Sequence, residues 1–368
     1  MKRFAHITGW GMAVPEKVLT NAELSLLVET SDDWIYARTG IRERHLASPD
    51  ETTASLATEA ALKALSVANL KPIEVDLIIV STTSPEHIFP ASACLVQDQI
   101  GAVKAGAFDL SAACTGFIFA LNMATQAIRS GSIENALVIG SETLSRIVNW
   151  TDRSTCILFG DGAGAFVLQA SNEPGGLLSA VMRSDGSGED LLSLPAGGSR
   201  LPASLETVKK GLHYIHMNGR EVFRFATRVM VQSTHETLKA AGLDIDDIHL
   251  VIPHQANQRI LEAAARGLNI PMERMVTNLD RYGNTSTASI PIATCEAINQ
   301  GRLNPGDNVV FVAFGGGLTW GAAVAKWRSP FPVRYKVRPQ RYQFWARLRS
   351  LLNRFQRYIE GLIWGRDN

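Results

Sequence analysis

Residues 105–120 read AGAFDLSAACTGFIFA, and the fold predicted for the chain is built outward from this stretch. The β-type run at 107–110 gives way through small residues to Cys114, and an apolar helical pattern follows. A helix that begins at or just after Cys114 points its first free N–H groups at the sulfur, which favours the nucleophilic thiolate over the thiol. The alternative is a buried core thiol, because free cysteine packs like a small hydrophobe.

The composition is that of an ordinary globular enzyme. The 368 residues are 46% hydrophobic and 19% charged, which suits two domains or one large composite fold. The four cysteines are widely spaced and form no CxxC pair, which argues against a zinc site or a disulfide framework. No secretory h-region follows Met1, and no apolar run reaches the roughly 18 residues of a spanning helix. We therefore expect a cytoplasmic protein without a metal.

In the first half of the chain, apolar runs typical of buried strands alternate with helical patterns. Strands that are apolar on both faces belong to sheets covered by helices. The predicted elements are a helix at 52–68, a strand at 75–82, a helix at 114–130, a strand at 135–140 and a strand that resumes at 165–169 after a glycine-rich loop.

The same order of elements recurs in the second half at a nearly constant offset. Residues 238–252 repeat the pattern of 65–79 at an offset of 173, and 307–315 repeat that of 134–140 at about 172. Residues 278–289 fall opposite the cysteine turn. Several matches in one order predict a duplicated α/β fold. Because active sites in such sheets lie at the carboxyl ends of strands, the corresponding turns of the two halves should meet in one crevice.

The turns that should meet carry residues suited to nucleophilic catalysis. His254 follows a buried strand within the run PHQAN, and Asn284 lies in GNTS, opposite Cys114. Either residue alone has an ordinary interpretation, His254 as a hydrogen-bonded core histidine and Asn284 as a common turn residue. Together, cysteine, histidine and asparagine at the ends of three buried strands indicate a catalytic set.

With these residues in place, the sequence resembles the type III β-ketoacyl-acyl-carrier-protein synthases of the thiolase superfamily. The resemblance runs from about residue 4 to residue 327. It implies a duplicated, five-layered αβαβα thiolase-like fold in a homodimer, with halves at 1–172 and 173–327. The motifs that carry it are TSDDWIYARTGIRERH (30–45), the Cys114 turn, TDR (151–153), FGDGAGA (159–165), NGREVF (218–223), PHQAN (253–257), GNTS (283–286) and FGGGLTWG (314–321).

The resemblance implies a decarboxylative Claisen condensation that starts fatty-acid synthesis. An acyl-CoA primer acylates Cys114, and malonyl carried on acyl carrier protein then loses carbon dioxide and attacks the acyl thioester. The N–H groups of Cys114 and of Gly316, in a glycine-rich turn, would hold the oxyanion. His254 and Asn284 would donate hydrogen bonds to the malonyl thioester oxygen, which requires a proton on Nε2 of His254. The substrates are acyl-CoA and malonyl-acyl-carrier protein, and no cofactor is implied.

The resemblance also assigns the residues that contact the substrates. Trp34 and Arg153 would stack on the adenine of CoA, Arg38 would meet its phosphates, and Asn257 would lie beside the pantetheine arm. Outside this context, Trp34 would be interpreted as a surface aromatic and Phe89 as a core residue. The residues implied for the acyl pocket are Phe89, Leu144, Phe159 and Leu191.

A group of arginines predicts a carrier-protein site. Arg220, Arg224 and Arg228 are spaced by four, so they form one stripe on a predicted helix, and Arg259 and Arg266 lie on the helix after PHQAN. Such charges usually mark a solvated face. Because the chain before its C-terminal tail carries a net charge of −7, we interpret these arginines as a docking surface for an acidic acyl carrier protein. We expect no nucleic-acid partner.

Residues 328–368 form a basic C-terminal extension with a net charge of +8, beyond the family core that should end near residue 327. After a linker at 329–339, apolar residues recur at helical spacing among arginines. A basic amphipathic helix in residues 340–368 is typical of a peripheral membrane anchor, but docking on a partner subunit or another protein, or packing on the body, is also open. The apolar positions are Phe344, Trp345, Leu348, Leu351, Leu352, Phe355, Tyr358, Ile359, Leu362 and Ile363.

Two other functions remain open from the sequence. Related enzymes condense non-acetyl starters in secondary metabolism or transfer acyl groups without decarboxylation. Loss of His254 or Asn284 would favour the simple transferase, and both residues are present. A non-catalytic scaffold would be expected to lose the nucleophile, yet Cys114 is intact.

Overall fold

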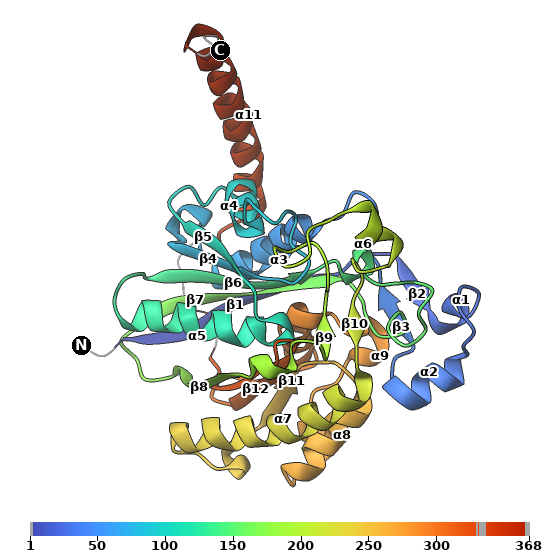
Figure 1. Ribbon diagram of the computed structural model, residues 1–368. Helices are drawn as coiled ribbons and strands as arrows, with labels where there is room; N and C mark the ends of the chain where they lie inside the picture. Colours follow the sequence, from blue (N-terminus) through green and yellow to red (C-terminus); the bar gives the residue numbers. More distant parts are fainter. Residues whose placement is uncertain (1–2, 329, 331–335, 365–368) are drawn as a thin grey trace.

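A computed structural model describes residues 3–328, 330 and 336–364, and two mixed sheets form its interior (Figure 1). The first sheet contains β1 (Phe4–Ala13), β4 (Leu77–Ser81), β5 (Gly106–Leu110), β6 (Asn135–Glu142) and β7 (Gly162–Ser171); the second contains β8 (Gly176–Ser184), β11 (Leu250–Pro253), β12 (Asn308–Gly315) and β13 (Thr319–Lys326). The strand orders are β1-β7-β6-β4-β5 and β8-β13-β12-β11.

The two sheets repeat one pattern of strand pairing. In each, a parallel pair (β4 with β6, and β11 with β12) continues into two antiparallel partners (β7 and β1, and β13 and β8). The two sheets differ at the outer side of this parallel pair. In the first sheet a fifth strand, β5, pairs in parallel with β4. In the second sheet the chain beside β11 forms only an isolated bridge, between Val251 and Met275. The duplicated α/β fold predicted from the sequence is therefore present. The boundary proposed from the sequence, 172–173, falls in the connection from β7 to β8.

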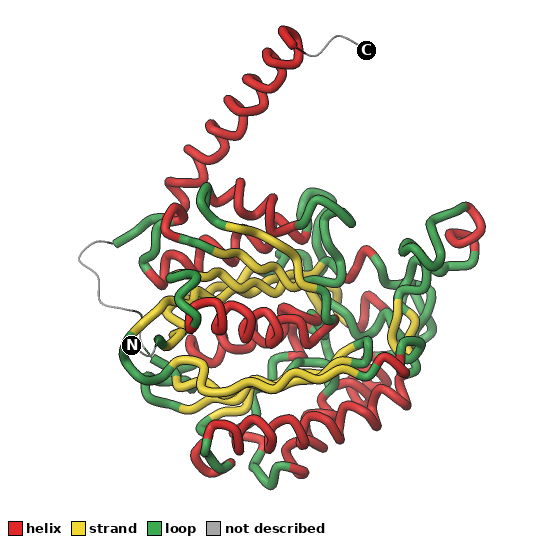
Figure 2. The backbone as a smooth tube through the Cα atoms, turned by 60° about the vertical axis from the view of Figure 1, so that its left-hand side comes forward, coloured by secondary structure: helices red, strands yellow, loops and turns green. Residues whose placement is uncertain are grey.

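Helices separate the sheets and cover their outer faces, which gives the five layers seen in Figure 2. The layer helices are α3 (Thr53–Ala68), α4 (Ser92–Ile100), α5 (Gly116–Arg129), α7 (Gly219–Ala241), α8 (Gln258–Gly267) and α10 (Ser289–Asn299). Both α5 and α10 lie between the sheets and pack against strands of each. The first sheet is covered by α3 and α4, and the second by α7 with α8 beside it.

Local signals in the sequence set the bounds of these helices. Thr52 and Ser55 form a capping box at the start of α3, and Asn69 ends the helix in a left-handed conformation with φ of 53°. The short elements that complete the fold are β2 (Val18–Thr20), α1 (Asn21–Leu24), α2 (Asp32–Thr39), β3 (Glu43–His45), β9 (Leu192–Ser193), α6 (Leu205–Lys209), β10 (His216–Met217) and α9 (Leu279–Tyr282).

The C-terminal extension forms one further helix, α11 (Pro339–Trp364), which leaves the body beside α4 and projects away from it (Figures 1 and 2). Parts of the predicted extension, residues 329, 331–335 and 365–368, lie outside the described residues. Among the helices that the structure describes, none has both the length and the apolar character to cross a membrane.

Candidate active site

Cys114 lies in the turn between β5 and α5, as the sequence predicted. A 3-10 turn at Ala113–Thr115 leads directly into α5, and Ala113 takes a left-handed φ of 47°, which turns the chain sharply before the cysteine. Gly315, at the end of β12, lies against this turn: a Cβ at that position would be 2.7 Å from the Cys114 nitrogen. The two halves of the fold therefore touch at the cysteine.

Cys114, His254 and Asn284 line one cavity of about 290 Å³. All three are buried, with 8%, 1% and 7% of their surface exposed. A second cavity, of about 340 Å³, is also lined by Cys114 and shares Phe159 and Leu192 with the first. The structure thus brings the three residues selected from the sequence together, with the cysteine at the junction of two cavities.

Burial determines the protonation of the cysteine and the histidine. It raises the pKa of the Cys114 thiol to about 12, and the Ser286 hydroxyl and the cysteine's own backbone N–H lower that pKa only in part, while the Glu142 carboxyl raises it further. Burial also lowers the pKa of His254 to about 3. At neutral pH the resting pair is a thiol and a neutral imidazole. Burial therefore favours the thiol over the thiolate expected at the helix start, because the loss of hydration outweighs the polar groups beside the sulfur.

Two residues that the sequence analysis did not select hold the His254 ring. Nδ1 lies 2.7 Å from Oγ of Ser289, and the Ser289 hydroxyl also lies 2.8 Å from the carbonyl oxygen of Ser286. Phe314 contacts the ring edge-on, with centroids 5.4 Å apart. Serine at the start of a helix is too common to mark Ser289 from sequence.

The Ser289 hydroxyl has one proton, and the direction in which this proton points determines the tautomer of His254 that it can pair with. If that proton points to the Ser286 carbonyl, Nδ1–H of the histidine donates to Ser289 and Nε2 is left as an acceptor. If the proton points to Nδ1, the neutral ring carries its own proton on Nε2. The protonated Nε2 required by the sequence analysis is therefore one of two forms that this contact accommodates.

The orientation of the Asn284 carboxamide is fixed by its own turn. Its Oδ1 accepts a hydrogen bond of 2.8 Å from the backbone N–H of Ser286. The amide oxygen is therefore used by a hydrogen bond within the protein, and the Nδ2 group is left to donate hydrogen bonds into the cavity.

Glu142, buried at the end of β6, ties the two halves together beneath the site. Its carboxyl group accepts hydrogen bonds from the Ser84 hydroxyl at 2.6 Å and from the Thr83 N–H at 3.0 Å. From the other half, the Thr287 hydroxyl donates to it at 3.0 Å. Burial raises the pKa of this carboxyl. Because Thr287 lies three residues after Asn284, the contact positions the asparagine turn; no motif in the sequence marked it.

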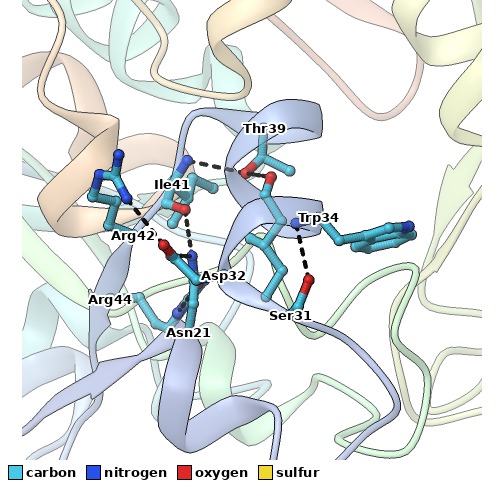
Figure 3. Close-up of polar contacts among 9 residues, drawn as sticks. Asn21, Ser31, Asp32, Trp34, Thr39, Ile41, Arg42 and Arg44 are labelled. Atoms are coloured by element: carbon cyan, nitrogen blue, oxygen red, sulfur yellow. Dashed lines mark hydrogen bonds and ion pairs between the residues drawn. The ribbon is translucent and has the colours of Figure 1, made fainter.

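The motif at 30–45 forms α2, the helix that positions Trp34. Ser31 caps the helix by accepting the Trp34 N–H at 3.2 Å, and the indole points away from the polar network (Figure 3). Within that network, the buried Asn21 donates to Asp32 at 2.8 Å and accepts from Arg44 at 2.9 Å (Figure 3). Burial lowers the pKa of Arg44 to about 10. A fully buried guanidinium thus anchors the helix that presents the tryptophan.

The four residues assigned to CoA lie together, three of them in the lining of the first cavity and Arg153 beside Trp34. Trp34, Arg38 and Asn257 line the cavity. The guanidinium carbons of Arg38 and Arg153 lie 4.2 Å and 5.2 Å from the Trp34 ring centroid. Asn257 caps α8 and donates to the carbonyl oxygen of Arg38 at 2.9 Å. The geometry gives a cationic and aromatic rim around one opening.

The residues assigned to the acyl pocket do not all lie together. Leu144 and Phe159 line the second cavity, but Leu191 lines neither cavity and its neighbour Leu192 lines both. Leu192 begins β9, and successive side chains along a strand point to opposite sides. The residue assigned from the sequence, Leu191, is therefore one position away from the leucine that lines the cavities. Phe89, in the loop between β4 and α4, is 85% exposed and lines neither cavity of its own chain.

The five arginines assigned to the carrier protein form an exposed surface on α7 and α8. Arg224 pairs with Glu221 at 2.9 Å. The Arg259 guanidinium lies 5.7 Å from the ring of Phe223, which lines the first cavity. The basic surface therefore reaches the rim of the cavity that holds Cys114. The exposed residues are Arg220, Arg224, Arg228, Arg259 and Arg266.

A duplicated α/β fold with cysteine, histidine and asparagine at the contact of its halves defines a class: the acyl-transferring condensing enzymes of the thiolase fold. Within that class, the chain belongs to the 3-oxoacyl-[acyl-carrier-protein (ACP)] synthase III family. The model of that family matches residues 108–186, and the model of its C-terminal part matches residues 238–327. Among the residues that the structure describes, no group of three or more His, Cys, Asp or Glu side chains is arranged to hold a metal ion.

Comparisons with known proteins agree along nearly the whole body. The chain is 55% identical over 329 residues to the β-ketoacyl-[acyl-carrier-protein] synthase III of Roseiflexus sp. (strain RS-1), covering 89% of this chain and all of that protein. It is 49% identical to the crystal structure of 3-oxoacyl-[acyl-carrier-protein] synthase III from Aquifex aeolicus VF5, with a TM-score of 0.82 and 88% and 100% of the two chains covered. The priming β-ketosynthase of the R1128 polyketide pathway is 34% identical, with a TM-score of 0.83 and coverage of 90% and 98%. The predicted family is confirmed.

Proposed function

We propose that the protein condenses an acyl-CoA primer with malonyl-acyl-carrier protein and thereby starts fatty-acid synthesis. The position of Cys114 at the junction of two cavities carries this proposal. One cavity opens past Trp34 and Arg38, and the other is lined by apolar side chains such as Leu144 and Phe159. A CoA thioester entering by the first can place its carbonyl at the sulfur and its acyl chain in the second.

In the first step, Sγ of Cys114 attacks the thioester carbon of the primer, a new thioester to the cysteine forms, and the CoA sulfur leaves. Because the resting cysteine is a thiol, a base must remove its proton as it attacks. Nε2 of His254, in its acceptor form, takes that proton and returns it to the leaving CoA sulfur. The N–H groups of Cys114 and Gly316, both residues of the second cavity, stabilise the oxyanion.

In the second step, the malonyl thioester loses carbon dioxide, and the electron pair left on its α-carbon attacks the acyl carbon on Cys114. The cysteine sulfur leaves as a thiolate and takes a proton from water, the one proton that the condensation consumes overall. The enolate oxygen accepts hydrogen bonds from Nδ2 of Asn284 and from Nε2–H of His254. The two steps need different forms of the histidine, and the Ser289 hydroxyl can pair with Nδ1 in both.

The partners follow from the same surfaces. Acidic acyl carrier protein would dock on the five exposed arginines of α7 and α8, where like charges concentrate at the cavity rim. A homodimer would form along β5, the outer strand of the first sheet, which leaves Phe108 40% exposed. The C-terminal helix would attach the enzyme peripherally to another surface, because its apolar side chains are exposed.

Intact-protein mass spectrometry tests the catalytic proposal. The protein is incubated with a panel of acyl-CoAs, acetyl to dodecanoyl and branched, and then with malonyl-acyl-carrier protein. We expect an adduct on Cys114 that is discharged only by the malonyl carrier, and no adduct in Cys114→Ser, which changes little volume. Adducts that pass to another acceptor would identify a simple acyltransferase instead.

The same panel separates primary from secondary metabolism. The similarity to the priming β-ketosynthase of the R1128 pathway favours this second candidate, a starter enzyme for polyketide synthesis. Preference for acetyl or short branched primers would support the first candidate, and exclusive use of a longer starter would support the second.

A further inference from the structure

Among the side chains of α11 that the structure describes, those near the beginning of the helix attach it to the body. At one residue per 1.5 Å, its 26 residues extend about 39 Å. Ala346 is buried, and a Cβ at Gly101 would lie 3.2 Å from the Ala346 methyl group. Arg349 pairs with Asp98 of α4 at 3.1 Å. From Leu351 to Leu362 every described side chain except the half-buried Ile359 is exposed.

The side of α11 that faces away from the body is apolar. The first turn of the helix carries Arg341 within this side and the exposed Tyr342 outside it. Beyond that turn, at 100° per residue, the exposed apolar side chains form a stripe about 140° wide, and Ala346 lies on the opposite side of the helix. These side chains are 40–64% exposed. The stripe, so defined, consists of Phe344, Trp345, Leu348, Leu351, Leu352, Phe355, Tyr358 and Leu362.

The charges beside the stripe determine what can cover it. Between residues 339 and 364 there are five arginines and one glutamate, a net charge of +4. Arg347 and Arg354 lie seven residues apart along one border of the stripe. The single acid, Glu360, accepts a hydrogen bond from Gln356 at 2.7 Å on the polar side.

A second copy of α11 fits this pattern poorly. Pairing along the stripe in an antiparallel coil would set Arg347 and Arg354 of one helix against the same arginines of the other. In a parallel coil they would face the apolar border that carries Trp345 and Leu352, with no acid to receive them. The stripe is also wider than the two-position seam that such a coil needs.

We propose that α11 lies in the plane of a membrane surface that carries anionic lipid, with the stripe in the acyl boundary and Arg347 and Arg354 on lipid phosphates. An anionic bilayer meets both features at once, since it accepts a wide apolar stripe with aromatic side chains and binds flanking arginines. The family relative from Roseiflexus is matched over its whole length by 329 of the 368 residues, and the family model ends at residue 327, so α11 is an addition to the family body.

This orientation leaves the catalytic body accessible. α11 leaves the molecule beside α4, at the opposite end from α7 and α8, which contribute Val222, Phe223 and Ile260 to the lining of the first cavity (Figure 1). The membrane proposal specifies the surface for the attachment proposed above and is independent of the catalytic assignment.

Vesicle sedimentation of the full chain tests the proposal, with phosphatidylglycerol–phosphatidylcholine vesicles compared with phosphatidylcholine alone. We expect binding to the anionic vesicles that weakens with salt. Leu351→Ser with Phe355→Ser removes apolar contact and should weaken binding roughly 10-fold or more. Arg347→Gln with Arg354→Gln should weaken it about 30-fold, from two charges near the lipid surface.

Asn353→Ser, on the side of the same helix away from the stripe, is the control and should bind like the natural chain. All four proteins should form the acyl-enzyme at equal rates without vesicles, so a failure of catalysis is distinguishable from a failure of attachment. No binding to anionic vesicles, or equal binding by the stripe variant, would overturn the proposal. A larger oligomer that only the stripe substitutions dissolve would assign the stripe to a second copy instead.

Discussion

At His254, the ring is held by contacts that suit a neutral imidazole. It is buried beside Phe314 and has a hydroxyl, not a carboxylate, on Nδ1. A buried imidazolium without an anionic partner is costly, which is why the pKa of His254 falls to about 3. The sequence located this histidine through its motif, but Ser289, which pairs with it, is 35 residues away and carries no pattern of its own.

The depressed pKa of His254 makes stability depend on pH in a definite direction. Its folded pKa of about 3 lies below the ordinary 6.5, so between these values the unfolded chain binds more protons. His254 therefore destabilises the fold as the pH falls below 6.5, by about 1.4 kcal/mol per pH unit. Urea unfolding at pH 7 and pH 5.5 should show a smaller loss of unfolding free energy in His254→Asn than in the natural chain. Equal losses in the two proteins would contradict the assignment.

Ser289 is a positioning residue for the same ring. Ser289→Ala leaves Nδ1 unpaired in a buried site, which should lower the unfolding free energy by about 1–3 kcal/mol. It also removes the contact that orients the ring for proton transfer, so we expect a loss of roughly 10- to 100-fold in rate. We expect kcat to fall while KM for acyl-CoA stays the same, because the CoA rim is untouched. Ser289→Thr should recover much of the rate, since it restores the hydroxyl. A changed KM with unchanged kcat, or no recovery in the threonine variant, would indicate a merely structural role.

At the scale of an element, the motif that forms α2 predicts a substrate contact but not the long-range contacts that hold the helix. The run at 30–45 marked Trp34 as a substrate contact, but the spacing did not reveal that Asn21, outside the run, joins Asp32 to the buried Arg44. Such a link depends on two segments packing together, which residue order alone does not specify. The helix is therefore held in place by long-range polar contacts.

Removal of the Asn21 side chain should disturb α2, the helix that positions Trp34. Asn21→Ala leaves the buried Arg44 and the Ile41 carbonyl each without a partner that it has in the structure, at a cost of about 1–3 kcal/mol for each group. We expect a lower unfolding free energy and a higher KM for acyl-CoA. The control is Arg42→Ala, which removes a half-exposed ion pair to Asp32 on the same helix and should cost under about 1 kcal/mol. Equal effects of the two substitutions would argue against Asn21 as the anchor.

At the scale of the whole molecule, duplication made the fold predictable. Two sheets with the same pairing order follow from the recurring buried strands, and the ends of those strands bring Cys114, His254 and Asn284 to one cavity. The direction of side chains within short segments was not predictable, as Leu192 in place of Leu191 shows. Nor did the helical pattern of the extension indicate that α11 projects from the body, because that depends on which face the body binds.

The duplicated fold leaves β5 as an outer strand of the first sheet, and we place the assembly interface there. An outer strand offers free backbone groups to another strand, and a two-fold axis would set the same residues of two copies against each other. We expect a dimer by light scattering coupled to size exclusion. Phe108→Asp places a carboxylate on this edge in both copies and should weaken the dimer about 10- to 100-fold, through lost apolar burial and charge repulsion.

Leu205→Asp, at an 82%-exposed position on α6, adds the same charge away from that edge and should leave the dimer intact. If both variants remained dimeric, the interface would lie elsewhere on the body. If the natural chain were a monomer while still forming the acyl-enzyme, Cys114, His254 and Asn284 would need no second copy for the first step of the reaction. Because those three residues and both cavities come from one chain, acylation of the Phe108→Asp monomer separates assembly from chemistry.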